Sequence, residues 1–173
     1  MRVLMAEDDS DTAVSYKRAL EQRNHSVLVA DNGEDCLKIY HEEFQKITSV
    51  TDATDHIQPF DAIVLDYKMP KIDGMEVAKE ILAVNPRQRV IFASAYVIET
   101  LQESIKQLKQ VVELMQKPFG PDALIETIED KEIYSELQKL DMNTDEFKKA
   151  NFRHEQLREV LELLRKLQKG KTF

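Results

Sequence analysis

Five short, mainly apolar segments alternate with segments of helical periodicity through the first 128 residues of the chain. The apolar segments, which we predict to be strands, are residues 3–6, 26–30, 62–65, 89–93 and 111–115. Helices are predicted at residues 14–23, from residue 34 onward, and at 75–82, 97–109 and 122–128. Strands that are buried on both faces lose the alternation of polar and apolar residues. The order therefore predicts an α/β fold in which helices cover both faces of a doubly wound, five-stranded parallel sheet.

The net charge of the chain changes sign near residue 130. Residues 1–130 hold 24 acidic and 14 basic side chains, a net −10, whereas residues 131–173 hold 8 and 10, a net +2. The second segment also carries apolar residues at helical spacing. We therefore expect one domain at residues 1–129 and a helical C-terminal extension at residues 130–173.

The sequence contains neither a candidate membrane span nor a signal peptide. No apolar run approaches the roughly 18 residues that a membrane helix needs. The N-terminus lacks the charged region, apolar stretch and cleavage site of a secretory signal. We expect a cytoplasmic protein with no membrane partner.

Residues with reactive or ligating side chains follow the ends of the predicted strands. These residues are Glu7 and Asp8 after the first strand, Asp66 after the third, Ser94 after the fourth and Lys117 after the fifth. The carboxyl ends of parallel strands meet at one edge of the sheet, where ligands bind in such folds. Crowded carboxylates repel one another unless a cation lies among them, and an incomplete shell of hard oxygen ligands suits Mg²⁺.

Each of these features alone also has a purely structural explanation. Asp9, Ser10 or Asp11 could cap the helix that follows the first strand, and a Lys-Pro pair such as Lys117-Pro118 is common in turns. Their joint occurrence at successive strand ends favours one shared site. A lysine and a hydroxyl beside a metal are suited to holding phosphoryl oxygens.

The segment that begins at Asp66 resembles a signature of the receiver domains of two-component response regulators. Residues 66–74 match the family pattern Asp-x-x-Met-Pro-x-x-Asp-Gly, and the resemblance covers about residues 2–129. It implies a flavodoxin-like receiver fold. It also implies a two-component or phosphorelay response regulator that accepts a phosphoryl group on Asp66 from a histidine kinase or phosphotransfer protein. Such a protein is a phosphoacceptor that promotes its own phosphotransfer, and not an enzyme in the usual sense.

The resemblance also implies a role for each residue of the site. The implied Mg²⁺ ligands are Glu7 through water, Asp8 and Asp66 directly, and Lys68 through its backbone carbonyl. The implied catalytic residues are the nucleophile Asp66, the hydroxyl residue Ser94 and the phosphate-pairing Lys117, which precedes a cis proline, Pro118.

The chain departs from the family pattern at three places. Leu114 stands where most members have an aromatic switch residue, which puts the usual route of signal output in doubt. Residues 109–111 replace a small pair before the fifth strand, on a face that many receivers use for dimerisation. Residues 44–59 contain an insertion, which we interpret as an extended helix plus loop, with disorder as the alternative.

Two side chains are predicted to tune the lifetime of the phosphoryl group. Lys68 follows the acceptor by two residues, and Tyr96 follows Ser94 by two. A charged lysine cannot accept a hydrogen bond from an attacking water, and a tyrosine ring over the site would exclude that water. We therefore expect slow autodephosphorylation. The alternative is that both side chains point to solvent and tune nothing.

The C-terminal extension leaves several roles open. It is expected to pack on the receiver, to form a homodimer, or to dock a partner protein. A DNA-binding regulator that uses these helices is the alternative function, since Arg165, Lys166, Lys169 and Lys171 give the segment a basic end. The segment is short for that purpose, so DNA is not the partner we expect. A phosphatase of the haloacid dehalogenase type would need a second Asp where Lys68 stands.

Overall fold

The computed structural model describes residues 1–49, 58–95, 105, 108, 112–130 and 159. Five strands form one parallel sheet in the order β2-β1-β3-β4-β5. The strands are β1 (Arg2–Ala6), β2 (Ser26–Ala30), β3 (Ala62–Asp66), β4 (Val90–Ser94) and β5 (Glu113–Gln116). The helices are α1 (Ser10–Gln22), α2 (Gly33–Thr48), α3 (Gly74–Val84) and α5 (Pro121–Glu129). The predicted doubly wound α/β fold is confirmed.

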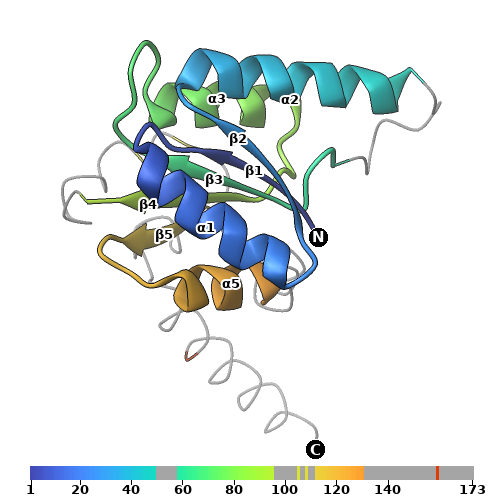
Figure 1. The fold of residues 1–173 in the computed structure, drawn as a ribbon. Coiled ribbons are helices and arrows are strands. Elements are labelled where there is room, and N and C mark those ends of the chain that lie inside the picture. The colour runs from blue at the N-terminus through green and yellow to red at the C-terminus, as the bar shows by residue number, and fades with distance from the viewer. Residues whose placement is uncertain (50–57, 96–104, 106–107, 109–111, 131–158, 160–173) are drawn as a thin grey trace, which may run out of the picture.

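The helices cover the two faces of the sheet in pairs, with α2 and α3 on one face and α1 and α5 on the other (Figure 1). Successive residues of a strand point to opposite faces, so β1 feeds both cores. Leu4 lies in the core beneath α2 and α3, whereas Val3 and Met5 lie in the core beneath α1 and α5. Each fully buried aliphatic side chain contributes about 1.5–3 kcal/mol to folding.

The observed bounds differ from the predicted ones mainly at the ends of elements. Strand β4 begins at Val90 and includes Ser94, one residue later than predicted at both ends, because its pairing with β3 begins at Val90 and its pairing with β5 extends to Ser94. Strand β5 runs over Glu113–Gln116 in place of residues 111–115, because its ladder with β4 begins at Glu113. Helix α1 begins at Ser10 because Asp9 caps it, accepting a hydrogen bond from the Thr12 N–H.

Some predicted elements fall outside the described residues. Of the helix predicted at 97–109, only Ile105 and Leu108 are described, and both are buried. The extended-helix part of the insertion is present, since α2 continues to Thr48, but residues 50–57 lie outside the described part of the chain. The C-terminal extension, apart from residue 159, also lies outside it. In the described segments, no helix is long and apolar enough to cross a membrane.

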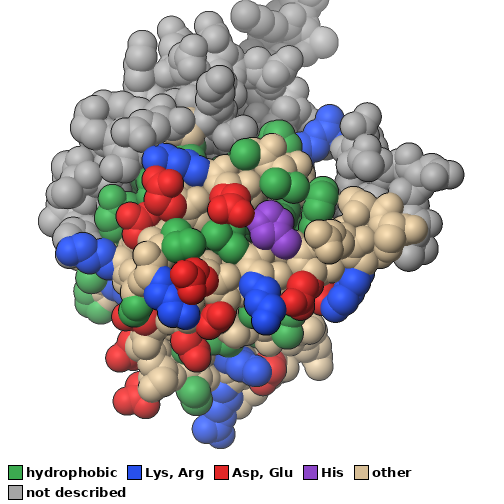
Figure 2. All heavy atoms as spheres, turned by 90° about the horizontal axis from the view of Figure 1, so that it is seen from above, with side chains coloured by type: hydrophobic (Ala, Val, Ile, Leu, Met, Phe, Trp, Pro, Cys, Tyr) green, Lys and Arg blue, Asp and Glu red, His purple; other side chains and the backbone are tan. Residues whose placement is uncertain are grey.

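The outer face of α2 and α3 carries interspersed acidic and basic side chains (Figure 2). Glu80 of α3 lies 2.9 Å from the His41 ring of α2, and Glu76 lies 2.6 Å from Lys79. Exposed pairs of this kind contribute at most about 1 kcal/mol each. Apolar side chains buried beneath α2 and α3, and not the ion pairs on their outer face, therefore hold these helices on the sheet.

A buried ion pair ties α5 to the sheet at the edge opposite the carboxyl ends of the strands. The Arg89 guanidinium donates to both carboxylate oxygens of Glu113, at 2.6 and 2.9 Å. It also donates to the carbonyl oxygens of Thr127 and Ile128, at 2.6 and 2.9 Å. These carbonyls belong to the last turn of α5, where helix carbonyls lack partners within the helix. Arg89 thus satisfies the end of α5 and anchors it beside β4 and β5.

Candidate functional site

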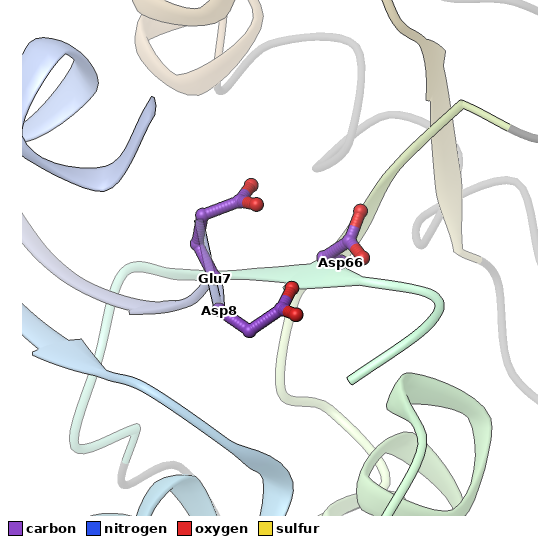
Figure 3. A group of neighbouring side chains, drawn as sticks. All are labelled: Glu7, Asp8 and Asp66. Carbon is purple, nitrogen blue, oxygen red and sulfur yellow. The ribbon is translucent and has the colours of Figure 1, made fainter. Parts of the chain in front are cut away.

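Three acidic side chains meet at the carboxyl edge of the sheet. Glu7 and Asp8 follow β1, and Asp66 is the last residue of the adjacent β3. One carboxylate oxygen from each lies within 4.8 Å of the others. Figure 3 shows their carboxyl groups gathered near the end of β3. The structure therefore brings together the acidic residues that the sequence predicted for the site.

Lys117, which follows β5 directly, reaches two of these acids. Its Nζ atom donates to Oε2 of Glu7 at 2.5 Å and to Oδ1 of Asp66 at 3.0 Å. The Lys117–Pro118 peptide bond is cis, as the resemblance implied. One ammonium group therefore offsets part of the charge of the acidic cluster.

Burial dominates the electrostatics of the site. Burial raises the pKa of the Glu7 and Asp66 carboxyls, and the hydrogen bonds and charge of Lys117 oppose this shift. Burial acts to lower the pKa of Lys117, but its hydrogen bonds to Glu7 and Asp66 raise the pKa above its usual value. The lysine is therefore held charged, while the two carboxylates are poorly solvated and gain from a further positive charge.

Asp8 and Asp9 have different surroundings. Asp8 is exposed and is the third member of the acidic cluster. Asp9 is not a member of the cluster, because its carboxylate caps α1. The capping explanation thus accounts for Asp9 but not for Glu7 or Asp8.

The loop after β3 holds the Asp66 carboxylate from the other side. The backbone N–H of Lys68 donates to Oδ2 of Asp66 at 3.2 Å. At the end of the loop, a Cβ on Gly74 would lie 2.2 Å from the Asp66 carbonyl oxygen, so this close approach requires glycine. The Lys68 side chain is exposed. Tyr96, the other residue predicted to tune the lifetime of the phosphoryl group, lies outside the described residues.

Ser94 ends β4, the strand next to Asp66. It is buried, and its carbonyl oxygen accepts a hydrogen bond from the Lys117 N–H at 2.8 Å. Ser94 and Lys117 are thus held by the same pair of strands. Leu114, on β5, is buried in the core beneath α2 and α3 together with Phe92.

The sequence did not single out one contact beside the site. The Tyr16 ring of α1 stacks on Phe119, with centroids 5.3 Å apart and planes 7° apart. The Tyr16 hydroxyl donates to the Phe119 carbonyl oxygen at 3.2 Å. In the sequence Tyr16 is one residue of an amphipathic helix, and nothing there signals a partner 103 positions away.

The donor set fits a magnesium ion. Three carboxylates that converge from one side offer hard oxygen ligands but an incomplete shell, and Mg²⁺ usually keeps waters and takes phosphate oxygens to complete its octahedron. Asp8 and Asp66 present oxygens to the shared space, and Glu7 is partly engaged by Lys117. The arrangement suits a metal-assisted reaction of an anionic substrate at Asp66.

Comparison with known proteins agrees with this arrangement. A family model described as "Response regulator receiver domain" matches residues 3–129. The response regulator receiver protein CpdR of Brucella abortus is 27% identical over 128 residues, which cover 74% of this chain and 93% of that protein. The chemotaxis protein CheY of Listeria monocytogenes is 25% identical over 135 residues, covering 75% of this chain and 96% of that protein.

Solved structures show the same fold. A receiver domain protein from Clostridium thermocellum superposes with a TM-score of 0.61 at 23% identity, over 82% of this chain and 98% of that one. The response regulator protein TrrA of Thermotoga maritima, solved in complex with Mg(2+)-BeF, has a TM-score of 0.54 at 27% identity. That match covers 73% of this chain and 95% of TrrA.

Proposed function

The chain belongs to the response regulator receiver domain family, and from this premise we propose that Asp66 is the residue that takes up the phosphoryl group. The donor is the phosphohistidine of a partner histidine kinase or phosphotransfer protein, or a small phosphodonor such as acetyl phosphate. The observation that carries the proposal is the position of the Asp66 carboxylate, which accepts a hydrogen bond from the Lys117 ammonium and forms the acidic cluster with Glu7 and Asp8.

The proposed transfer is a displacement at phosphorus. A carboxylate oxygen of Asp66 forms a bond to phosphorus while the bond from phosphorus to the donor breaks, and its electron pair leaves with the donor atom. The product is an aspartyl phosphate. Mg²⁺ would be held by Asp8 and Asp66, by Glu7 through water and by the Lys68 carbonyl, and when bound it would offset charge on the phosphoryl oxygens.

The remaining groups of the site are assigned by their positions. The Lys117 ammonium, already 3.0 Å from Asp66, is suited to pairing with a phosphoryl oxygen when that oxygen arrives. Ser94 ends the neighbouring strand, and its hydroxyl would donate a hydrogen bond to a second phosphoryl oxygen. Most of the rate then comes from positioning and from charge that is in place before the reaction.

Intact-mass spectrometry tests the assignment. Acetyl phosphate with Mg²⁺ should add one phosphoryl group to the wild-type chain, and Asp66→Asn should remove the product. Asp73→Asn is the matched control, since Asp73 belongs to the same signature but caps α3, and asparagine caps equally well. Unmodified wild-type protein, with a donor shown active on another receiver, would count against the proposal.

We further propose slow autodephosphorylation, tuned by Lys68 and Tyr96. The backbone contact of Lys68 with Asp66 supports its proximity to the acceptor. Lys68→Asn should shorten the lifetime of the phosphoryl group, because an amide can orient an attacking water. Tyr96→Ala should do the same by admitting water. Unchanged decay in both variants would mean that the two side chains face solvent.

The C-terminal extension is proposed to carry the output through protein contacts, as a homodimer or with a partner. The basis is its helical spacing of apolar residues and its nearly balanced charge. Light scattering of the full chain, with and without phosphodonor, should show a change in mass if the extension forms a homodimer. Tight, salt-sensitive binding to DNA would favour the transcriptional regulator instead.

A further inference from the structure

Helix α1 is connected both to the acidic residues of the site and to the segment that carries Lys117. At its N-terminus, the capping residue Asp9 follows the acidic pair directly. Two turns later, Tyr16 stacks on Phe119 and donates its hydroxyl hydrogen to the Phe119 carbonyl oxygen. The helix therefore links the loop that carries two acids to the loop that carries Lys117.

The backbone around Lys117 is held at two points. On one side its N–H donates to the Ser94 carbonyl oxygen at 2.8 Å, which extends the ladder between β4 and β5. On the other side the chain leaves the sheet at Pro118 and meets Tyr16 at Phe119, before α5 begins at Pro121. Tyr16 thus supplies a side-chain anchor for the segment between Lys117 and α5.

We propose that Tyr16 is a positioning residue that sets the Lys117 ammonium against Asp66 through its stack and hydrogen bond with Phe119. The proposal rests on the roles proposed above for Asp66 and Lys117. Displacing a charged group by about 1 Å from its productive place can cost up to about 100-fold in rate. The lysine side chain is long, so its Nζ position depends on where its backbone is fixed.

The Tyr16 hydroxyl is suited to this task. It is largely buried, and burial raises the pKa of Tyr16, so the hydroxyl keeps its proton at neutral pH and can donate it to the Phe119 carbonyl oxygen. Its ring also belongs to the core beneath α1 and α5. A purely structural role would affect stability, but would not act on the reaction through Lys117.

Phosphorylation rates with acetyl phosphate and saturating Mg²⁺ separate the two roles. Because the donor is a small molecule, docking of a partner protein does not enter the rate. We expect Tyr16→Leu to slow phosphorylation about tenfold and Tyr16→Phe, which keeps the ring, about two- to threefold. Val14→Ala, at an exposed position of the same helix, should react at the wild-type rate. Mg²⁺ affinity should stay within about twofold throughout, since the acids are not displaced.

A double-mutant cycle tests the route through Lys117. In a Lys117→Ala background, Tyr16→Leu should cause no further loss, because the group that it positions is gone. An equal loss in both backgrounds, a wild-type rate for Tyr16→Leu, or a parallel loss of Mg²⁺ affinity would overturn the proposal. If Tyr16→Leu does not fold, Tyr16→Phe decides, and a wild-type rate there overturns it. A wild-type chain that takes up no phosphoryl group would instead reject the function on which the proposal rests.

Discussion

The Nζ atom of Lys117 lies 3.0 Å from Oδ1 of Asp66, although β4 separates β3, which ends at Asp66, from β5, which Lys117 follows. The same Nζ atom also contacts Glu7. The lysine thus spans the central strands and ends on the acid at which chemistry is proposed. Its positive charge opposes metal binding and favours an arriving phosphoryl group, so its removal should affect the two in opposite directions.

Replacing Lys117 tests that opposition. Lys117→Gln should slow phosphorylation by acetyl phosphate about 100-fold, because a fixed charge beside the phosphoryl oxygens is lost. It should not weaken Mg²⁺ binding, since the change removes a positive charge from the metal site. Stopped-flow and metal titration measure the two quantities. Lys117→Arg keeps the charge, so its phosphorylation rate should fall less than that of Lys117→Gln. A parallel loss of rate and Mg²⁺ affinity in Lys117→Gln would argue that Lys117 only maintains the fold.

Asp8 offers a test of the metal site that leaves the buried contacts intact. Mg²⁺ should raise the thermal midpoint of the wild-type chain, because a ligand that binds only the folded state stabilises it. Asp8→Asn should remove most of this gain without lowering the midpoint of the metal-free protein, since Asp8 is exposed. Asp11→Asn, an exposed acid in the first turn of α1, is the control. An Mg²⁺ effect that survives Asp8→Asn would place the metal elsewhere.

The Arg89–Glu113 pair is expected to be the most sensitive charged contact of the described fold. Arg89→Met leaves the buried Glu113 carboxylate without its guanidinium and should cost about 3–5 kcal/mol in chemical denaturation. Arg89→Met combined with Glu113→Leu should recover more than half of that loss, because no charge then stays buried. Lys17→Met removes an exposed pair with Glu21 and should change stability by less than about 1 kcal/mol. A double variant as unstable as the single one would assign the loss to the α5 carbonyls.

Glycine is required where α2 approaches the loop after β3. A Cβ on Gly33 would lie 2.2 Å from the Ile72 carbonyl oxygen, and backbone on both sides prevents an easy shift. Gly33→Ala should therefore lower the free energy of unfolding by at least about 2 kcal/mol. Gly120→Ala is the matched control, since nothing lies within 4 Å of its Cβ position, and it should change stability by less than about 1 kcal/mol. Equal effects of the two changes would mean that the loop relaxes.

The sequence predicted the parts of the structure that depend on local pattern. Strand β2 was predicted with its observed bounds, because its apolar run lies between a helix end and a turn. Glu7, Asp8, Asp66 and Lys117 were predicted to meet, because parallel strands bring their carboxyl ends to one edge. The capping role of Asp9 was among the stated possibilities and is observed.

Contacts between distant segments were beyond such patterns. Arg89 was taken for the first residue of a strand, and its pairing with Glu113 and the end of α5 depends on three segments meeting in space. The stack of Tyr16 on Phe119 joins residues that have no common periodicity. Charge and aromatic character show that such side chains need partners, but only the fold decides which partners they find.

The most direct test of the account is to locate the phosphoryl group on the chain. An aspartyl phosphate is an acyl phosphate, so borohydride reduces it to an alcohol and converts the modified aspartate to homoserine. After reaction with acetyl phosphate and Mg²⁺, tandem mass spectrometry of proteolytic fragments should find homoserine at position 66. Cleavage after glutamate keeps residues 44–76 in one fragment, so Asp73 serves there as the internal control and should stay unmodified. Homoserine at another position, or none in a chain that has gained a phosphoryl group, would contradict the assignment of Asp66 as the acceptor.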